Sequence, residues 1–319
     1  MKRIIATVGP SLLNAVPLTE VHHHRNIYRI NGAHGSIDDV EQYIFEIKRQ
    51  IEDAEILMDL PGNKVRTSNV DKPIHLQKGK TFELGFSQTN YKEFYSLLNL
   101  GDIVWANDST FEFIVEQINL ENRVILMRSK SNGHLENNKG LHVRGIHSDI
   151  PFLFDKDKAL IHLANKHKLS FVGLSFVRNA QDIRQAKTLI DASVKIISKV
   201  ETKAAVDNLI DILNEVEYIL VDRGDLSTEI GMEKIPAYQS FILNKATFYN
   251  KKVFLATQFL KNMEINPIPT IPEVIDMYNT LRTGIYGLQM SEETAIGEYP
   301  KECLDTIVNL MNEIDSEKL

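Results

Sequence analysis

The sequence has little cysteine, no long hydrophobic run and no excess of positive charge. Its single cysteine, Cys303, excludes an internal disulfide, and a cytoplasmic location is the default expectation for such a chain. Nowhere do about 18 apolar residues follow one another, so we expect no membrane-spanning segment. The formal net charge of −7 gives no electrostatic reason to expect nucleic acid as a partner. An anionic substrate stays possible, because a site needs only a few well-placed cations.

What is present is the composition of an ordinary globular protein. Hydrophobic residues make up 43% and charged residues 25% of the 319 residues, which argues against disorder. A chain of this length suits either two domains or one α/β barrel that carries an insertion.

Short apolar runs alternate with helical patterns along most of the chain. Several runs are nearly continuous in Val and Ile, which is typical of strands buried on both faces of a parallel sheet. In the intervening segment Asp38–Ile51, apolar residues recur on one helical face. The predicted strands are Ile4–Val8, Ile27–Ile30, Glu55–Asp59, Phe171–Leu174, Val194–Lys199, Tyr218–Val221, Val253–Ala256 and Ile285–Met290. This alternation predicts an α/β protein with a (β/α)₈ TIM barrel.

One connection is much longer than the others. Roughly 95 residues separate Asp59 from a helix expected near Asp155. They contain short alternating runs bounded by Gly, Asn and Asp: Ile74–Leu76, Thr81–Leu84, Asp102–Trp105, Phe113–Gln117 and Val124–Arg128. Such runs predict a small antiparallel β domain, inserted after the third strand on a βα loop, where it would cover the catalytic mouth. We therefore predict barrel residues 1–67, an inserted cap of residues 68–147, and barrel residues 148–319.

The residues that follow the predicted strands are rich in cations, carboxylates and hydroxyls. In such barrels the active site is built from the carboxyl ends of the strands. Here those ends are Gly9-Pro10-Ser11, Arg29-Ile30-Asn31, Asp59, Ser175-Phe176, Lys199-Val200-Glu201, Asp222-Arg223-Gly224-Asp225, Thr257-Gln258 and Ser291-Glu292-Glu293. A barrel without a site would show ordinary polar loop residues there, so the pattern favours an enzyme.

Two carboxylates follow adjacent strands and indicate a metal site. Glu201 and Asp225 can reach one point above the barrel, and two hard oxygen donors with open positions suit Mg²⁺ or Mn²⁺. Loop carboxylates held by Arg223 or Lys199 are an equally good interpretation of the spacing alone.

Nearby cations indicate a phosphorylated substrate. Lys199 ends a buried strand and could neutralise a phosphoryl group, form a Schiff base, or make only a structural ion pair. The donor forks of Arg29 and Arg66 suit a doubly charged phosphate. If the backbone amides of Gly224 and Asp225 open a helix, they form an anion site for a carboxylate. Together these features predict a site for a small phosphorylated acid.

Six segments in order carry motifs of one known family. They are Ala6-Thr7-Val8-Gly9-Pro10-Ser11, Tyr28-Arg29-Ile30-Asn31-Gly32-Ala33-His34-Gly35, Lys195-Ile196-Ile197-Ser198-Lys199-Val200-Glu201, Val221-Asp222-Arg223-Gly224-Asp225-Leu226, Ala256-Thr257-Gln258-Phe259-Leu260 and Met290-Ser291-Glu292-Glu293-Thr294-Ala295. On these segments the chain resembles the pyruvate kinase family from Ala6 to Pro300. The resemblance implies a glycolytic phosphotransferase that converts phosphoenolpyruvate and ADP to pyruvate and ATP by in-line phosphoryl transfer.

The resemblance also assigns roles to individual residues. Glu201 and Asp225 would hold the divalent metal, and Lys199 would stabilise the migrating phosphoryl group and the enolate. Arg29 would bind the phosphoryl group, and Thr257 would lie near the enol carbon of the substrate. The remaining assignments are the amides of Gly224 and Asp225 for the carboxylate, Ser291 and Glu293 for a proton relay, and Pro10, Asn31, His34, Arg66 and Lys139 for the nucleotide. The chain has no G-x-x-x-x-G-K-[ST] loop, so a nucleotide must be held in another way.

Several positions depart from the family pattern. Leu60 and Lys64 stand where K⁺-requiring members have Thr and Glu, and Ala33 replaces a serine hydroxyl of the monovalent-ion site. Since the Lys64 ammonium can supply the missing charge, we expect no requirement for K⁺. Asp222 replaces a small residue, and the chain is expected to lack the family's C-terminal regulatory domain.

These departures keep two alternatives open. One is a diverged barrel enzyme that uses phosphoenolpyruvate or a related 2-oxo acid in a biosynthetic pathway, as a different kinase or a lyase. The other is a non-catalytic binding relative, against which the joint presence of Lys199, Glu201, Asp225, Arg29 and Thr257 speaks. A homo-oligomer formed through the barrel is compatible with each of these hypotheses.

Overall fold

The computed structural model describes residues 1–14, 16–107, 110–146 and 150–317, which belong to two compact units. The first unit comprises Met1–Gly62 and Phe152–Leu319, and the second comprises Asn63–Pro151. Residues 63–67 thus belong to the second unit, and the predicted boundary at 147/148 lies outside the described residues. Within the described ranges, every helix is too short or too polar to cross a membrane.

The first unit is a closed barrel of parallel strands, which confirms the predicted fold class. Around the barrel the order is β1-β15-β14-β13-β12-β11-β3-β2, and β1 closes it by pairing with both β2 and β15. The strands are β1 (Arg3–Thr7), β2 (Asn26–Asn31), β3 (Ile56–Asp59), β11 (Phe171–Leu174), β12 (Lys195–Val200), β13 (Tyr218–Asp222), β14 (Lys252–Ala256) and β15 (Gly287–Met290). Because all the strands run the same way, their carboxyl ends meet at one end of the barrel.

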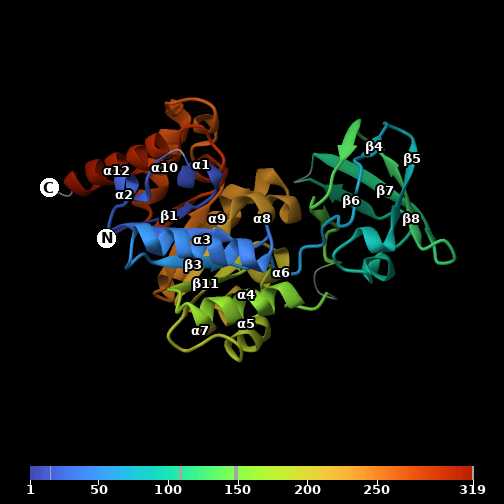
Figure 1. The fold of residues 1–319 in the computed structure, drawn as a ribbon, viewed down its shortest axis with the longest axis horizontal. Coiled ribbons are helices and arrows are strands. Elements are labelled where there is room, and N and C mark those ends of the chain that lie inside the picture. Colours follow the sequence, from blue (N-terminus) through green and yellow to red (C-terminus); the bar gives the residue numbers. More distant parts are fainter. Residues whose placement is uncertain (15, 108–109, 147–149, 318–319) are drawn as a thin grey trace. The chain divides into compact units, whose positions relative to one another are not determined.

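Helices surround the barrel on its outside (Figure 1). Helix α3 shows why: Ser36 and Asp39 form a capping box at its start, and Val40, Ile44 and Ile47 are buried on one face. The helices of this unit are α1 (Pro10–Asn14), α2 (Leu18–Val21), α3 (Ile37–Gln50), α4 (Asp155–Lys166), α5 (Ala180–Lys187), α6 (Lys203–Asp207), α7 (Leu209–Glu215), α8 (Arg223–Ile230), α9 (Ile235–Phe248), α10 (Ile271–Arg282), α11 (Glu292–Ala295) and α12 (Pro300–Ser316).

The inside of the barrel contains two layers of side chains. An apolar layer is formed by Ile5, Ile27, Leu57, Phe171, Ile197, Tyr218, Leu220, Phe254 and Ala256. Successive side chains of a strand alternate between its two faces, so the residue two positions further along points inward again. On six strands that residue is Thr7, Arg29, Asp59, Gly173, Lys199 or Asp222. We call these six residues the polar layer.

The second unit contains a five-stranded antiparallel sheet, which confirms the predicted antiparallel β domain (cyan to green in Figure 1). Its order is β10-β6-β7-β8-β5, and a separate pair, β4 with β9, lies beside it in the same unit. The strands are β4 (Ile74–Leu76), β5 (Thr81–Gly85), β6 (Ile103–Ala106), β7 (Phe111–Asn119), β8 (Val124–Ser129), β9 (Gly133–Leu135) and β10 (Leu141–His142). The sequence did not predict β9 and β10, because Gly133–Leu135 has no second large apolar residue to alternate with Leu135 and Leu141–His142 has only two residues.

Candidate active site

Lys199 lies at the centre of the polar layer. Its side chain is buried, and its Nζ donates to Ser175 Oγ at 3.1 Å and to Asp59 Oδ2 at 3.3 Å. Nζ also lies 2.7 Å from Glu201 Oε1 and 4.0 Å from Asp222 Oδ2. The ammonium therefore shares its charge among three carboxylates that come from different strands.

Arg29 is fixed beside Lys199 by two neighbouring strands. Its Nε donates to Asp59 Oδ2 at 2.7 Å, and its Nη1 donates to Thr7 Oγ1 at 2.8 Å. The Asp59 carboxylate thus joins the two buried cations of this layer. Gly173 makes room for it, because a Cβ at that position would lie 2.8 Å from Asp59 Oδ1.

Glu201 is completely buried just after β12. Its Oε2 accepts a hydrogen bond of 2.7 Å from the backbone N–H of Phe176, while Oε1 makes the ion pair with Lys199 but accepts no hydrogen bond. Phe176 has a positive φ of 55°. Such a backbone conformation costs energy for a bulky residue and is often found at functional sites.

Asp222 ends β13 and caps helix α8. Its Oδ1 accepts from the backbone N–H of Gly224 at 3.1 Å and of Asp225 at 3.4 Å. The Gly224 N–H also lies 3.0 Å from Thr257 Oγ1. The predicted carboxylate-binding amides do open a helix, but in this structure a carboxylate of the chain itself holds them.

Three carboxylates of this cluster have the arrangement that a metal ion needs. Glu201, Asp222 and Asp225 each offer an oxygen, and these oxygens lie within 4.8 Å of one another. With Asp59, the cluster holds four carboxylates against the two cations Lys199 and Arg29. This formal excess of negative charge and the hard oxygen donors fit a divalent cation such as Mg²⁺ or Mn²⁺.

The electrostatics keep Lys199 charged. Burial alone would lower its pKa, but Asp59, Glu201 and Asp222 together raise it well above the ordinary value. Burial alone would raise the pKa of Asp59, yet Lys199 and Arg29 hold it below its usual range. For Glu201 and Asp222, burial and then neighbouring carboxylates, chiefly Asp225, raise the pKa. Lys199 is therefore a permanent cation and not an amine ready to form a Schiff base.

Ser291 and Glu293 follow β15, where the sequence places them. The Glu293 carboxylate is buried and accepts from the backbone N–H of Ser291 at 2.8 Å. Burial raises the pKa of Glu293. A buried carboxyl group with a raised pKa keeps its proton to a higher pH than an exposed one does, which favours a role in a proton relay.

Three predicted nucleotide residues lie at the carboxyl ends of β1 and β2. Pro10 opens helix α1 and is exposed. Asn31 ends β2, where its Oδ1 accepts from the N–H of Ala33 at 3.1 Å, and His34 follows on an exposed turn. The structure thus presents these three residues at the end of the barrel that carries the cluster.

The two other predicted nucleotide residues, Arg66 and Lys139, belong to the second unit. They lie on neighbouring segments of chain: Arg66 forms a bridge with Gly140, and the N–H of Lys139 donates to Thr67 Oγ1 at 2.8 Å. The Lys139 Nζ lies 3.4 Å from a carboxylate oxygen of Glu136. The backbone segments that carry these two cations are therefore adjacent in the second unit.

The prediction of site residues omitted members of the polar layer. Thr7, Asp59 and Asp222 of this layer, and Ser175 beside it, contact Arg29 or Lys199; the sequence analysis placed the last three at strand ends but gave none of the four a role in the site. A signal was available for three of them. Thr7, Asp59 and Asp222 each stand two positions after an inward apolar residue, the same spacing that relates Lys199 to Ile197.

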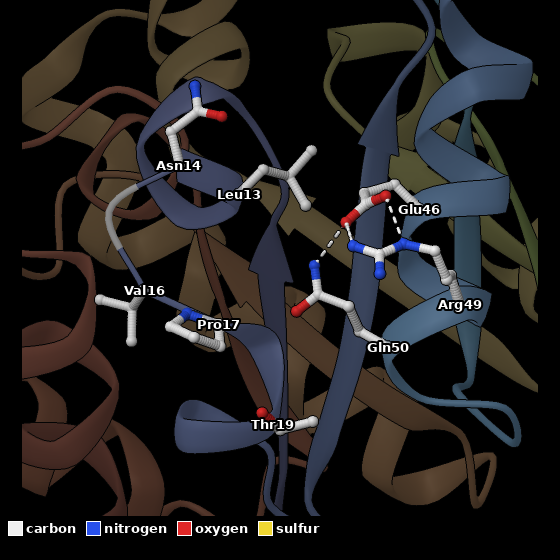
Figure 2. A pocket seen from close by; sticks show the side chains of 8 residues that line it. All are labelled: Leu13, Asn14, Val16, Pro17, Thr19, Glu46, Arg49 and Gln50. Atoms are coloured by element: carbon white, nitrogen blue, oxygen red, sulfur yellow. Dashed lines mark hydrogen bonds and ion pairs between the residues drawn. The ribbon is translucent and has the colours of Figure 1, made fainter.

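A hollow on the surface of the first unit involves other residues. It has a volume of about 510 Å³ and lies between the loop after α1 and the end of α3, as Figure 2 shows. Its lining is Leu13, Asn14, Val16, Pro17, Thr19, Glu46, Arg49 and Gln50. Its charged groups bond to one another, since Arg49 and Gln50 both donate to Glu46 (Figure 2). It shares no residue with the carboxylate cluster and does not resemble a catalytic site.

The barrel and its charged cluster define a (β/α)₈ enzyme with its site at the carboxyl ends of the strands. The family model "Pyruvate kinase, barrel domain" matches residues 1–304. Pyruvate kinase of Thermotoga maritima is 31% identical over 99% of this chain and 71% of its own length. For the pyruvate kinase of Borreliella burgdorferi these values are 30%, 100% and 69%, and for that of Aeropyrum pernix they are 31%, 93% and 67%. The chain belongs to the pyruvate kinase family and is a pyruvate kinase-like phosphotransferase.

Proposed function

We propose that the protein transfers the phosphoryl group of phosphoenolpyruvate to ADP, giving pyruvate and ATP, and that it depends on Mg²⁺ or Mn²⁺. The observation that carries the proposal is the polar layer together with Glu201 and Asp225. It places two buried cations beside three carboxylates whose oxygens lie within 4.8 Å of one another. Such a site suits an anionic substrate only when a divalent cation offsets the excess negative charge.

Arg29 and Lys199 would bind and stabilise the phosphoryl group. Arg29 contacts Asp59 through Nε and Nη2 and Thr7 through Nη1, which fixes the plane of its guanidinium and leaves the second N–H of Nη1 and of Nη2 for phosphoryl oxygens. Lys199 stays protonated and can offset the charge that develops on the phosphoryl group and on the enolate oxygen. Because both side chains are held in place before substrate binds, little reorganisation is needed during transfer.

Glu201 and Asp225 would hold the metal. When bound, the metal would supply positive charge for the oxygens of the substrate. The N–H of Phe176 orients Glu201 through its Oε2, and this contact fixes where the carboxylate points.

Thr257, Ser291 and Glu293 would complete the reaction by protonating the enolate. Thr257 has a positive φ of 75°, which is strained for a β-branched residue. Its Oγ1 lies 3.0 Å from the N–H of Gly224 and so faces the amides expected to bind the substrate carboxylate. The raised pKa of Glu293 favours its protonated form, which suits a proton donor reached through Ser291.

Pro10, Asn31 and His34 are the residues of the barrel that we assign to the nucleotide. Considered separately, Arg66 and Lys139 of the second unit have the charge to bind its phosphates. A glycolytic role in the cytoplasm is part of the same proposal. A homo-oligomer formed through the barrel would draw support from α10, where Ile271 and Ile275 expose apolar side chains.

K⁺ should not be required for activity. Leu60, which replaces a hydroxyl in the expected monovalent-ion site, is an apolar side chain buried at 2% exposure, and it offers no oxygen ligand. The sequence supplies the cation Lys64 four residues later.

A phosphorus NMR assay tests the function directly. Purified protein is incubated with phosphoenolpyruvate, Mg²⁺ and each of several nucleoside diphosphates, with and without KCl at constant ionic strength. We expect the phosphoenolpyruvate signal to be replaced by that of a nucleoside triphosphate, with ADP as an active acceptor, and at the same rate with and without K⁺. No consumption of phosphoenolpyruvate with any acceptor would rule out the kinase. A several-fold rate increase on adding KCl would contradict only the K⁺ proposal.

A further inference from the structure

The carboxylate of Asp222 lies where an anionic ligand would bind to helix α8. This helix has eight residues, and the N–H groups in its first turn have no partner within the helix itself. Such groups attract anions because they donate hydrogen bonds at the positive end of the helix dipole. Here Asp222 Oδ1 accepts from two of them, the N–H groups of Gly224 and Asp225, at 3.1 and 3.4 Å.

We propose that Asp222 is a specificity-determining residue, because its own carboxylate competes with the carboxylate of the substrate for these amides. This inference rests on the proposed function and concerns the same site. The two carboxylates cannot share the position, since they require the same donors and carry the same charge. A substrate carboxylate must therefore displace Asp222 Oδ1 before it can reach Gly224 and Asp225.

The surroundings of Asp222 increase this competition. Its carboxylate already lies within 4.8 Å of oxygens of Glu201 and Asp225, so a further carboxylate enters a cluster of like charges. Glu201, which has no exposed surface, accepts no hydrogen bond at Oε1 and depends there on the ammonium of Lys199. The cluster is thus built to receive positive charge, and Asp222 makes it less receptive to a carboxylate.

Asp222 has an attractive neighbour besides the two amides. Its Oδ2 faces Lys199 Nζ at 4.0 Å, beyond hydrogen-bonding distance but close enough for the charges to attract. Displacement therefore leaves the side chain near a cation. It does, however, remove its two hydrogen bonds to the helix, and this loss is what weakens substrate binding.

The test compares a carboxylate ligand with a ligand that lacks one. Phosphoenolpyruvate and inorganic phosphate are titrated calorimetrically into the full chain at saturating Mn²⁺, for the original protein, Asp222→Ala and Asp222→Asn. Alanine removes the competing carboxylate from both amides and leaves the Gly224 N–H only its contact with Thr257 Oγ1, so we expect phosphoenolpyruvate to bind about tenfold more tightly. The affinity for phosphate should change less than about twofold, since a phosphoryl group is expected to bind to Arg29 and Lys199 and not to these amides. Asparagine keeps a neutral cap, so its effect should be intermediate and in the same direction.

Each outcome decides a separate question. Unchanged or weaker binding of phosphoenolpyruvate by Asp222→Ala would overturn the inference. If the alanine variant does not fold, the same result for Asp222→Asn would overturn it. A loss of Mn²⁺ affinity in Asp222→Asn, titrated without substrate, would make Asp222 a metal ligand and would also overturn it. If the original protein binds no phosphoenolpyruvate and turns none over, the proposed function fails instead.

Discussion

The two layers inside the barrel differ by only two residues along each strand, yet they have opposite properties. The apolar layer, which includes Phe254 and Ile197, is completed by contacts among its own side chains. In the polar layer, Arg29 and Lys199 face Asp59 and Asp222, and the neighbouring Glu201 and Asp225 bring the carboxylates to four against these two cations, so that the site is completed only by a ligand that brings positive charge. The pleat of the same strands therefore produces a stable core at one level and a reactive site at the next. Three substitutions distinguish residues that stabilise the core from residues that serve the reactive site.

The largest effect on stability should come from the apolar layer. Phe254 is fully buried, and its ring packs edge-on against Tyr286 at 5.3 Å. Phe254→Ala should lower the free energy of unfolding by about 3–5 kcal/mol, measured by urea denaturation. The protein that remains folded should keep its kcat within a few-fold. Phe248→Ala is the control: Phe248 ends α9 with 79% of its surface exposed, and its replacement should cost less than about 0.5 kcal/mol. Equal costs for the two variants would contradict the role of the apolar layer.

The largest effect on catalysis should come from the polar layer. Lys199→Met keeps much of the side-chain volume but removes the charge that is needed most in the transition state. We expect kcat to fall about 10²–10³-fold, equivalent to about 3–4 kcal/mol, with a much smaller change in the affinity for phosphoenolpyruvate. Lys195→Met, on the same strand but exposed, should leave kcat unchanged. A normal kcat with a large rise in KM would make Lys199 a binding residue only. Trapping of pyruvate on Lys199 by borohydride would instead support a Schiff-base lyase.

A smaller effect should be the pH dependence of metal binding. Burial and the neighbouring carboxylates raise the pKa of Glu201 to about 7 in the protein without metal. Protons therefore compete with the metal below this pH, because a metal ligand must be ionised. The affinity for Mn²⁺ should rise by up to about tenfold per pH unit between pH 5 and about 7, and level off above.

The stability of the metal-free protein should change in the opposite direction. A raised pKa in the folded state contributes stability at low pH that is lost as pH rises toward 7. Glu201→Gln should weaken Mn²⁺ binding and flatten its pH dependence. The control, Glu217→Gln at an exposed position, should change neither the Mn²⁺ affinity nor its pH dependence. Titration of Mn²⁺ at three pH values checks this, and a pH-independent affinity in the original protein would contradict it.

The sequence predicted the barrel and the central residues of its site because both depend on local patterns. Buried parallel strands appear as apolar runs, and Lys199 and Glu201 stand at the end of one of them. The partners of Lys199 were harder to predict. Asp59 and Ser175 reach it from strands that are distant in the sequence, and only the register of the barrel brings them together.

The conformation of Asp222 could not be predicted from the sequence. An aspartate at this position could equally have pointed into the cluster or capped the helix that follows, since both are ordinary uses of its side chain. In the structure the two oxygens of the carboxylate do different things: Oδ1 caps α8, and Oδ2 faces Lys199. This choice depends on the balance of charges in the whole layer, which a linear pattern does not contain.

The pairing of β1 with β15 has a consequence for how the chain is made. Arg3 lies opposite Gly287, so β1, which is synthesised before the other barrel strands, waits for the last of them, β15, before one of its edges is covered. Contacts so distant in sequence form slowly, and an unpaired strand edge can associate with other chains in the meantime. The incomplete barrel therefore stays exposed to aggregation until β15 has emerged and closes the ring.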